Sequence, residues 1–391
     1  MYYIRCESGF RMGLGVIIDS LRLKGHFMRS SNVEYLPKLD HLRFLAALLV
    51  FSFHFVHYFF LHWQSLPSRP WLSVIVEGHT GVGLFFTLSG FLFMLIGLKS
   101  ENLDYKKFIT NRILRIFPLF LVVFFVAISV GREVFSAADW GYLFFSNLGQ
   151  APTSNSFITG AAWTISIEFT FYLAFPFLAL FVKKAGFRYL VNLLLLMLLF
   201  KVSAYFVIEN HVHVYYSTLL GRFDQFLIGM LMACLYVQYR HTLNKYGVVL
   251  LLFFASLVVV SAAVLGRYAS FFDPDGHAWL WVIWSFVESF GWGGLIVGWL
   301  SVSWSLPTWL QRWVQRGGEI SYSFYLLHGM VIVITYQWLG GLQVTHVPIL
   351  DAALLFVSVF LLVWMVASLS YETIEKPFLS LRRTYVSDGK Y

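Results

Sequence analysis

The chain has 391 residues, of which 59% are hydrophobic and only 12% are charged. A soluble protein carries roughly twice that share of charged residues, so the composition excludes a soluble enzyme and indicates a polytopic membrane protein. The formal net charge of +8 does not require a nucleic-acid partner, because basic loops on one membrane face also produce it. Two cysteines are too few for a disulfide framework.

Apolar segments long enough to cross a bilayer follow one another along the chain, and we expect each to be a helix. The predicted fold is all-α, a bundle of about ten transmembrane helices. The predicted spans lie near residues 42–63, 79–98, 113–131, 163–182, 188–208, 223–239, 246–265, 278–304, 320–341 and 348–370. Residues 1–35 are expected to be a cytoplasmic tail, either disordered or ahead of the true start, and residues 379–391 a second cytoplasmic tail.

Basic residues are concentrated in every second loop between the predicted spans. These loops and the end of the chain carry Lys99, Lys106, Lys107, Arg112, Arg115, Lys183, Lys184, Arg188, Arg240, Lys245, Arg312, Arg316, Lys376, Arg382, Arg383 and Lys390. The alternate loops carry only Arg69, Arg132, Arg222 and Arg267. By the positive-inside rule, this alternation predicts that both termini are cytoplasmic.

The first predicted span carries two ionisable residues eleven positions apart, Arg43 and His54. Eleven helical residues return to nearly the same azimuth, so both side chains are predicted on one face, roughly 16 Å apart along the axis. His54 then lies near the middle of the bilayer, where an ionisable group is costly and is therefore a functional-site hypothesis. The alternative is that Arg43 snorkels to the surface and His54 only bonds to a neighbour.

The second and third spans supply small residues and cations. Gly78, Gly81, Gly83 and Gly90, together with Ser89, permit close helix approach, and Ser89 lacks the surroundings of a nucleophile elbow.

Arg112 and Arg115, three residues apart, share one helix face and with Lys106 and Lys107 could bind phosphates. The alternative is ordinary basic flanking of a membrane span.

Further ionisable residues occur inside later spans. Glu168 lies roughly 8 Å below the start of the fourth span, so it should be paired, protonated or functional. Glu288 and Lys201 are also buried at membrane depth. His328 lies about 12–13 Å into the ninth span, close to the depth of His54, so the two histidines are expected to meet.

Several segments together resemble the acyltransferase family 3 membrane proteins, the sugar O-acyltransferases, from about Leu36 to Phe378. The segments, in family order, are LDHLRFLAALLVFSFHF, GVGLFFTLSGFLF, NRILRIFP, WTISIEFTFYL, GRFDQFLIGM, ISYSFYLLH and YETIEKPF. The resemblance implies a membrane domain over residues 36–378 in a bacterial inner membrane. Some members carry an SGNH hydrolase-like domain; this chain stops soon after its last span, so we expect the membrane domain to transfer the acyl group itself or to pass it to a separate protein.

The resemblance also implies roles for individual residues. Arg43 and His54 would be the essential pair. Arg112 and Arg115 would assist the acyl-donor side, and Glu168 and Arg222 would shape the pocket. Beyond what the resemblance implies, we predict that Glu168 is catalytic with Arg43 and His54, and that Lys106 and Lys107 help to bind the donor. The predicted supporting pocket residues are Ser89, Trp163, Glu288 and His328.

The expected reaction moves an acyl group, by default acetyl, from cytoplasmic acyl-coenzyme A to a hydroxyl of a sugar, polysaccharide or glycolipid. His54 would act as general base, or alternatively carry the acyl group covalently. Neither a bound cofactor nor a metal is expected, because no Cys/His cluster, Walker loop or dinucleotide fingerprint occurs.

A transporter or proton relay that uses His54, Glu168, Glu288 and His328 is the alternative function. No internal repeat or pair of broken helices supports it.

Overall fold

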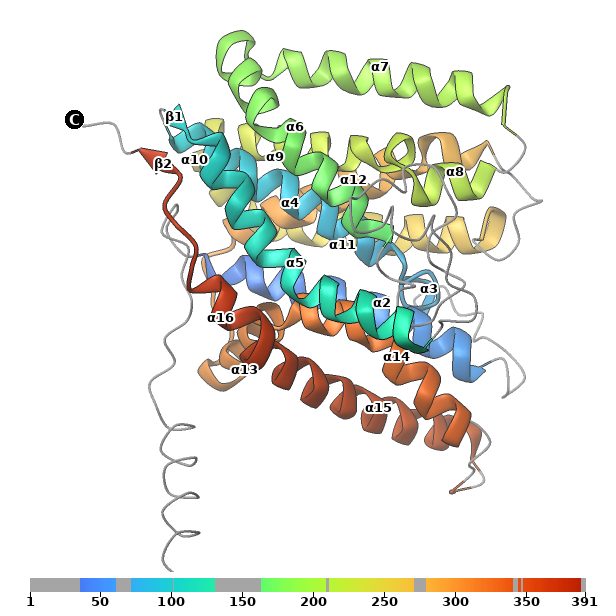
Figure 1. The fold of residues 1–391 in the computed structure, drawn as a ribbon. Helices are drawn as coiled ribbons and strands as arrows, with labels where there is room; N and C mark the ends of the chain where they lie inside the picture. The colour runs from blue at the N-terminus through green and yellow to red at the C-terminus, as the bar shows by residue number, and fades with distance from the viewer. Residues whose placement is uncertain are drawn as a thin grey trace, which may run out of the picture.

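The computed structural model describes residues 36–60, 72–100, 102–130, 163–208, 211–270, 279–339, 344–345 and 347–387 (Figure 1). The predicted tail over residues 1–35 lies outside these residues. The long helices are α2 (Pro37–Phe60), α4 (Thr80–Lys99), α5 (Tyr105–Val130), α6 (Trp163–Ala185), α7 (Arg188–Tyr205), α9 (Leu219–Gln238), α11 (Gly247–Tyr268), α12 (Leu280–Ser301), α14 (Ser321–Leu339) and α15 (Pro348–Ser370). Shorter elements are α3 (Ser73–Val76), α8 (His211–Ser217), α10 (Arg240–Lys245), α13 (Thr308–Glu319), the π-helical turn η4 (Tyr371–Glu375), α16 (Lys376–Leu379) and the strands β1 (Asn102–Leu103) and β2 (Val386–Ser387).

The predicted multi-pass helical fold is confirmed. Among the described residues, nine helices are long and apolar enough to cross a membrane, and the pair α13 and α14, bent by 72°, makes ten if it counts as one span. These helices overlap the ten predicted segments, but α5 begins at Tyr105 and not near residue 113, so Lys106, Lys107 and Arg112 lie on a helix and not in a loop. Residues 308–319, expected in a loop, instead form α13, whose apolar side packs on α2 through a T-shaped contact of Trp313 with Phe44, ring centroids 5.2 Å apart.

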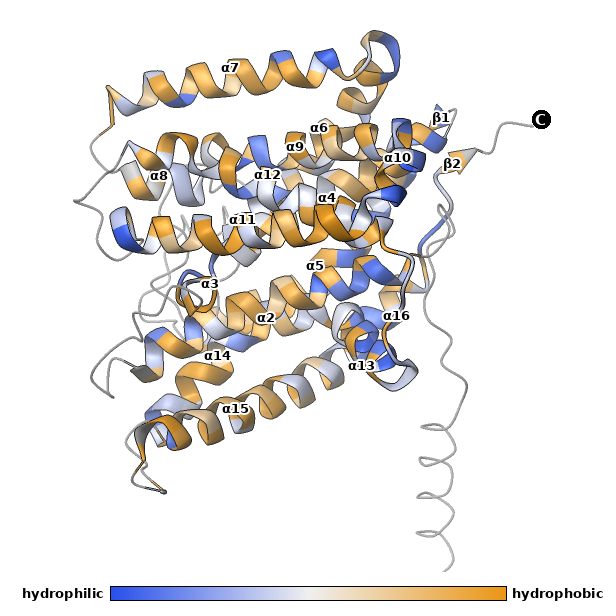
Figure 2. Ribbon diagram, turned by 180° about the vertical axis from the view of Figure 1, so that it is seen from behind, coloured by the Kyte–Doolittle hydropathy of each residue, from blue (hydrophilic) through white to orange (hydrophobic). Residues whose placement is uncertain are grey.

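The long helices run side by side, with α4 in the centre of the bundle and α7 at its edge (Figure 1). In α4, 78% of the most apolar stretch is buried, whereas in α7 only 11% is buried. The surface of α7 is mostly hydrophobic (Figure 2), as expected for a helix that faces lipid.

Helices α4 and α9 approach each other closely because each presents a glycine to the other's backbone. A Cβ atom on Gly90 would lie 2.1 Å from the carbonyl oxygen of Phe226, and one on Gly229 would lie 2.0 Å from that of Thr87. Neither distance allows a side chain, so these glycines are required for the contact. The interpretation of Gly90 as a helix-packing residue is confirmed.

Hydrophilic residues gather at the end of the bundle where β1, α10, α13 and α16 lie (Figure 2). We call this the basic end, because the predicted basic loops meet there. The paired strands β1 and β2 also lie at this end, with Asn102 opposite Ser387 and Leu103 opposite Val386. The positive-inside rule predicts that the basic end faces the cytoplasm.

Candidate active site

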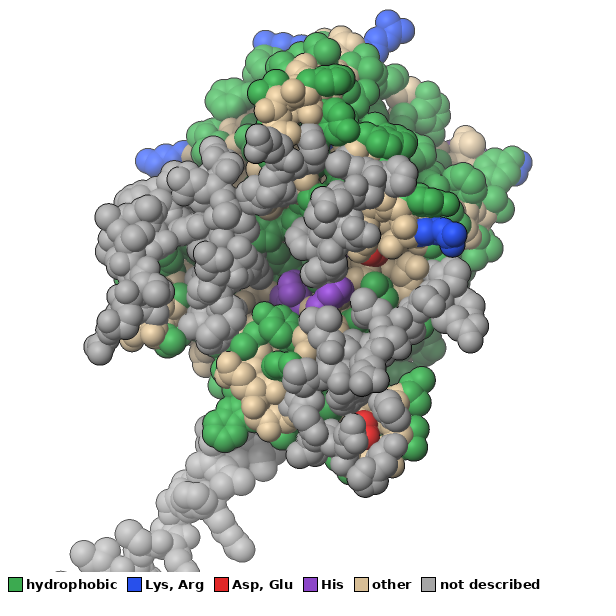
Figure 3. Space-filling view, turned by 90° about the vertical axis from the view of Figure 1, so that its right-hand side faces the viewer, with side chains coloured by type: hydrophobic (Ala, Val, Ile, Leu, Met, Phe, Trp, Pro, Cys, Tyr) green, Lys and Arg blue, Asp and Glu red, His purple; other side chains and the backbone are tan. Residues whose placement is uncertain are grey.

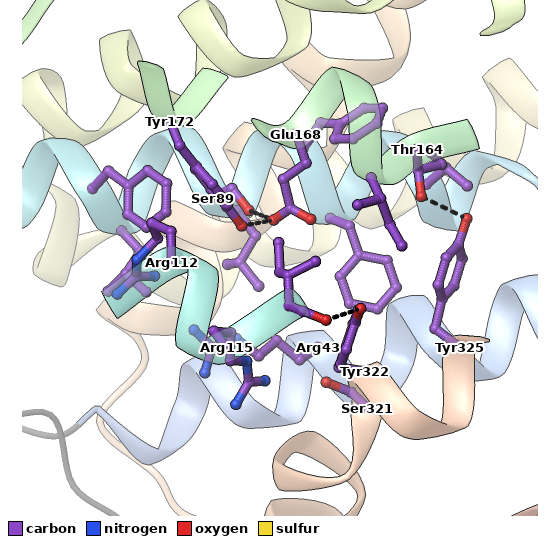
Figure 4. Close-up of a pocket in the computed structure, with 18 residues that line it drawn as sticks. Arg43, Ser89, Arg112, Arg115, Thr164, Glu168, Tyr172, Ser321, Tyr322 and Tyr325 are labelled. Carbon is purple, nitrogen blue, oxygen red and sulfur yellow. Dashed lines mark hydrogen bonds between the residues drawn. The ribbon is translucent and has the colours of Figure 1, made fainter. Parts of the chain in front are cut away.

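A cavity of about 850 Å³, including space open to solvent, lies between α2, α4, α5, α6 and α14 (Figure 4). Its polar lining is Arg43, Ser89, Arg112, Arg115, Thr164, Glu168, Tyr172, Ser321, Tyr322 and Tyr325. Seven of the remaining lining residues are Phe, Leu, Ile or Val side chains of α4 and α5, among them Phe85, Phe93 and Ile116. A cavity that combines apolar lining residues with a few convergent polar groups is typical of a ligand-binding site.

Three arginines from two helices line this cavity. Arg112 and Arg115, one helical turn apart on α5, both face it, and Arg43 enters from α2 and forms an ion pair with Asp40 at 2.6 Å. In the described part of the chain, neither Arg112 nor Arg115 forms an ion pair with a carboxylate.

The guanidinium group of Arg112 lies among aromatic rings instead. It is 5.1 Å from the ring centroid of Phe93 and 5.9 Å from that of Tyr172, and its buried Nε has no hydrogen-bond partner. Aromatic faces orient a guanidinium without neutralising it. Arg112 and Arg115 can therefore turn their guanidinium groups to an anionic ligand, with Glu168 also lining the cavity.

Glu168 faces the same cavity from α6. Its Oε1 accepts a hydrogen bond from the hydroxyl of Ser89 at 3.3 Å and another from the hydroxyl of Tyr172, one turn along α6 (Figure 4). The predicted pocket residues Ser89 and Glu168 therefore contact each other. Tyr172 donates to Glu168, and its ring also lies beside the guanidinium group of Arg112. Glu168 and Arg112 therefore lie on the same side of the cavity, with Tyr172 between them.

The cavity reaches the Thr164 and Tyr325 side chains, which hydrogen-bond to each other across α6 and α14 at 3.2 Å (Figure 4). Nearer the basic end, the hydroxyl of Tyr322 donates to the carbonyl oxygen of Ile116 at 2.8 Å and ties α14 to α5. The tyrosines of α14 thus fix the width of the cavity between these helices.

His54 and His328 meet directly beyond Tyr325. His328 Nε2 is 3.1 Å from His54 Nδ1, and the rings of Tyr325 and His328 have centroids 5.8 Å apart. The expectation that the two histidines meet is confirmed. Neither histidine lines the cavity, so Tyr325 lies between the cavity and the pair. Histidine side chains are visible from the end of the bundle opposite the basic end (Figure 3).

The hydrogen bonds of the histidine pair determine which ring nitrogens carry hydrogen when both rings are neutral. His54 Nδ1 is 2.9 Å from the carbonyl oxygen of Val50, and His328 Nδ1 is 2.5 Å from that of Tyr325. A carbonyl oxygen only accepts, so both Nδ1 atoms carry hydrogen. His328 Nε2 therefore accepts from His54 Nδ1–H, and His54 Nε2 keeps a lone pair.

Two buried residues beside this pair were missed by the sequence analysis. Glu77 Oε2 and His79 Nε2 are within hydrogen-bond distance at 3.0 Å, and Ser270 donates to the other carboxylate oxygen of Glu77 at 2.9 Å. The His79 ring packs against Phe53, centroids 5.3 Å apart, one residue before His54. The sequence feature that could have indicated them is a glutamate and a histidine two residues apart at the start of a membrane span.

The other predicted site residues lie away from the cavity. Arg222 donates to Glu288 Oε2 at 3.1 Å, and Gln225 donates to the same oxygen at 2.9 Å. Gly83 makes room for this cluster, because a Cβ atom there would lie 2.6 Å from Glu288 Oε1. Trp163 packs against Tyr216, ring centroids 5.2 Å apart.

Lys106 and Lys107 line a separate depression at the basic end, together with Asp104, Thr110, Asn111, Leu381 and Arg383. Lys107 is paired with Asp104 at 3.2 Å. The structure thus separates the two lysines from the cavity that holds Arg112 and Arg115, although all four lie on α5.

Comparison with known proteins gives one family for most of the chain. The model of an acyltransferase domain matches residues 36–368. A provisionally named O-acetyltransferase of Staphylococcus aureus strain COL is 24% identical over 404 aligned residues, which cover 90% of this chain and 58% of that protein. The peptidoglycan O-acetyltransferase OatA of Listeria monocytogenes is 25% identical over 391 residues, 88% of this chain and 56% of OatA.

A third relative, the acyltransferase MdmB of Streptomyces mycarofaciens, is 31% identical over 169 residues, which cover 40% of this chain and 42% of MdmB. The chain spans a little over half the length of the Staphylococcus and Listeria proteins, at 58% and 56%. No solved structure matches the chain.

Proposed function

The chain belongs to the acyltransferase family whose domain covers residues 36–368, and from this premise we propose that it is an O-acyltransferase of the bacterial inner membrane. The donor is acyl-coenzyme A, with acetyl as the default acyl group, and it enters the cavity from the basic end. The acceptor is a hydroxyl group of a sugar, polysaccharide or glycolipid at the opposite end. The O-acetyltransferase names of the relatives support the reaction class.

One observation carries the proposal: a cavity lined by Arg112 and Arg115, which form no ion pair among the described residues, reaches a tyrosine that contacts a histidine pair. Phosphate groups suit Arg112 and Arg115, because guanidinium groups bind phosphate oxygens through two parallel hydrogen bonds. With the phosphates held there, the thioester end of the donor extends along the apolar walls towards Thr164 and Tyr325. It then points at the histidine pair.

His54 Nε2 is the general base in the proposed reaction. It takes the proton of the acceptor hydroxyl as that oxygen attacks the thioester carbonyl carbon. The carbon–sulfur bond breaks, the new ester is released on the acceptor side, and the coenzyme A thiolate takes up the proton. The tautomer set by the Val50 carbonyl oxygen leaves Nε2 unprotonated and ready for this role.

The purified protein in liposomes tests this function. With acetyl-coenzyme A and a mixture of oligosaccharides from peptidoglycan and other surface glycans, we expect free coenzyme A thiol to appear only when an acceptor is present. Mass spectrometry of the acceptor should show one added acetyl group per thiol released. Thiol release without an acceptor, or transport of an oligosaccharide without thiol release, would contradict the proposal and favour a transporter.

His328 is proposed as a positioning residue that acts through His54. Replacing His328 with leucine removes one of the two acceptors of His54 Nδ1–H and leaves the Val50 carbonyl oxygen. We expect kcat to fall about tenfold, the loss of one hydrogen bond to a ring that becomes charged, with KM for the donor unchanged. His328→Gln retains an acceptor oxygen and should recover most of the rate. Equal losses in both variants would mean that His328 only fills space.

A further inference from the structure

The segment that follows α16 is held against the start of α5 by several hydrogen bonds. Asn111 donates from Nδ2 to the carbonyl oxygen of Arg383 at 2.6 Å, and the Arg383 amide donates to Asn111 Oδ1 at 3.0 Å. The Asp104 amide donates to the carbonyl oxygen of Tyr385 at 2.9 Å, and β2 then pairs with β1. We call residues 380–387 the strap.

The residues that hold the strap against α5 are buried as well as hydrogen-bonded. Asn111 is 2% exposed and Tyr385 is 2% exposed. The Tyr385 ring meets the Phe108 ring edge-on, with centroids 5.3 Å apart, and the guanidinium of Arg112 lies 5.5 Å from the centroid of that same Phe108 ring. The strap and the arginine wall of the cavity are therefore separated by one aromatic side chain.

The strap brings cations to the basic end of the cavity. Arg382 is half-buried, and burial together with repulsion from Arg115 and Arg112 lowers its pKa to about 10. Arg383 lines the second depression with Lys106 and Lys107, a space of about 870 Å³ that includes volume open to solvent. One carboxylate, Asp104, faces these three cations and pairs with Lys107, so positive charge remains in excess.

Cations placed beside one another without matching carboxylates cost electrostatic energy unless an anion binds among them. The residues that fasten the strap hold its cations in this arrangement. The strap also lies outside residues 36–368, the part of the chain matched by the acyltransferase domain. Its residues do not line the cavity already described.

We propose that the strap and the depression formed by Lys106, Lys107 and Arg383 bind the 3′-phosphorylated nucleotide end of the acyl donor, while Arg112 and Arg115 hold its pyrophosphate. This inference rests on the proposed function, because it takes coenzyme A as the donor. A donor that reaches from the depression past Arg382 into the cavity would bind cations along its length. Recognition of the 3′-phosphate would then distinguish coenzyme A from shorter thioesters.

The test compares donors that differ only in this phosphate. We expect the double variant Lys106→Ala/Arg383→Ala to raise KM for acetyl-coenzyme A about tenfold with kcat unchanged, because each phosphate contact contributes to binding and not to the chemical step. KM for acetyl-(3′-dephospho)-coenzyme A should stay at the wild-type value. Arg312→Ala, which removes an exposed arginine of α13 at the same end, is the matched control and should behave as wild type.

A second variant keeps the cations but loosens the strap. Asn111→Leu removes both hydrogen bonds to Arg383, so it should raise KM for acetyl-coenzyme A and leave that for S-acetylpantetheine, which lacks the nucleotide, unchanged. Retained turnover of S-acetylpantetheine shows that a variant is folded. If the variants weaken all donors equally or none, the strap is not a nucleotide site. If the wild type turns over none of these donors, the proposed function itself fails, and the strap proposal fails with it.

Discussion

Replacing His54 with alanine should lower the rate of acetyl transfer at least about 100-fold, because a positioned general base contributes that much or more to proton transfer. Nε2 is the nitrogen that the Val50 and His328 contacts leave with a lone pair. The measurement is release of coenzyme A thiol by purified protein in liposomes with acceptor present. Binding of acetyl-coenzyme A should change little, because His54 does not line the cavity proposed to hold the donor phosphates.

Two controls separate lost chemistry from lost folding. His241→Ala removes an exposed histidine of α10 and should keep wild-type activity. His54→Gln preserves a side chain of similar length but has no ring nitrogen that can take up a proton, so it should be as inactive as His54→Ala. Thermal unfolding and detergent-resistant insertion should match the wild type for all three variants. Substantial turnover by His54→Ala would remove His54 from the mechanism.

The sequence sufficed to predict the long helices, apart from the start of α5, and to predict that the histidines meet, but it did not predict α13. Hydropathy locates spans because every backbone polar group in lipid must be bonded internally, which makes a long apolar run a helix. Depth then follows from the rise of 1.5 Å per residue, so His54 and His328, entering from the same side, could be matched in depth. The observed separation of 3.1 Å agrees.

The azimuth of each helix could not be predicted in the same way, because it depends on packing between segments far apart in the chain. The ion pair between Arg222 and Glu288 joins α9 to α12, and no spacing in the sequence indicates it. The hydrogen bond of Thr164 to Tyr325, which marks the inner end of the cavity, joins α6 to α14. Lys106 was grouped with Arg112 by proximity, but the structure places it in the depression outside the cavity.

Replacing both Arg112 and Arg115 with glutamine should raise KM for acetyl-coenzyme A by about 10- to 100-fold for each arginine lost, since a hydrogen bond to a charged group contributes about 1.5–3 kcal/mol. The effect should fall on KM more than on kcat, because in the proposed binding mode these residues contact the donor phosphates and not the reacting atoms. Steady-state kinetics with acetyl-coenzyme A, at fixed acceptor, measure both. Glutamine keeps much of the side-chain length, so the apolar packing around the guanidinium is largely retained.

The single lysine variants test the geometry of binding. Arg115→Lys keeps the charge but loses the planar fork, so it should recover only part of the affinity. Arg112→Lys should be worse, because the guanidinium of Arg112 lies among the rings of Phe93, Phe108 and Tyr172, which a planar group fits and an ammonium does not. Full recovery by both lysines would reduce the role of the pair to charge alone. An unchanged KM in the double glutamine variant would mean that the donor binds elsewhere.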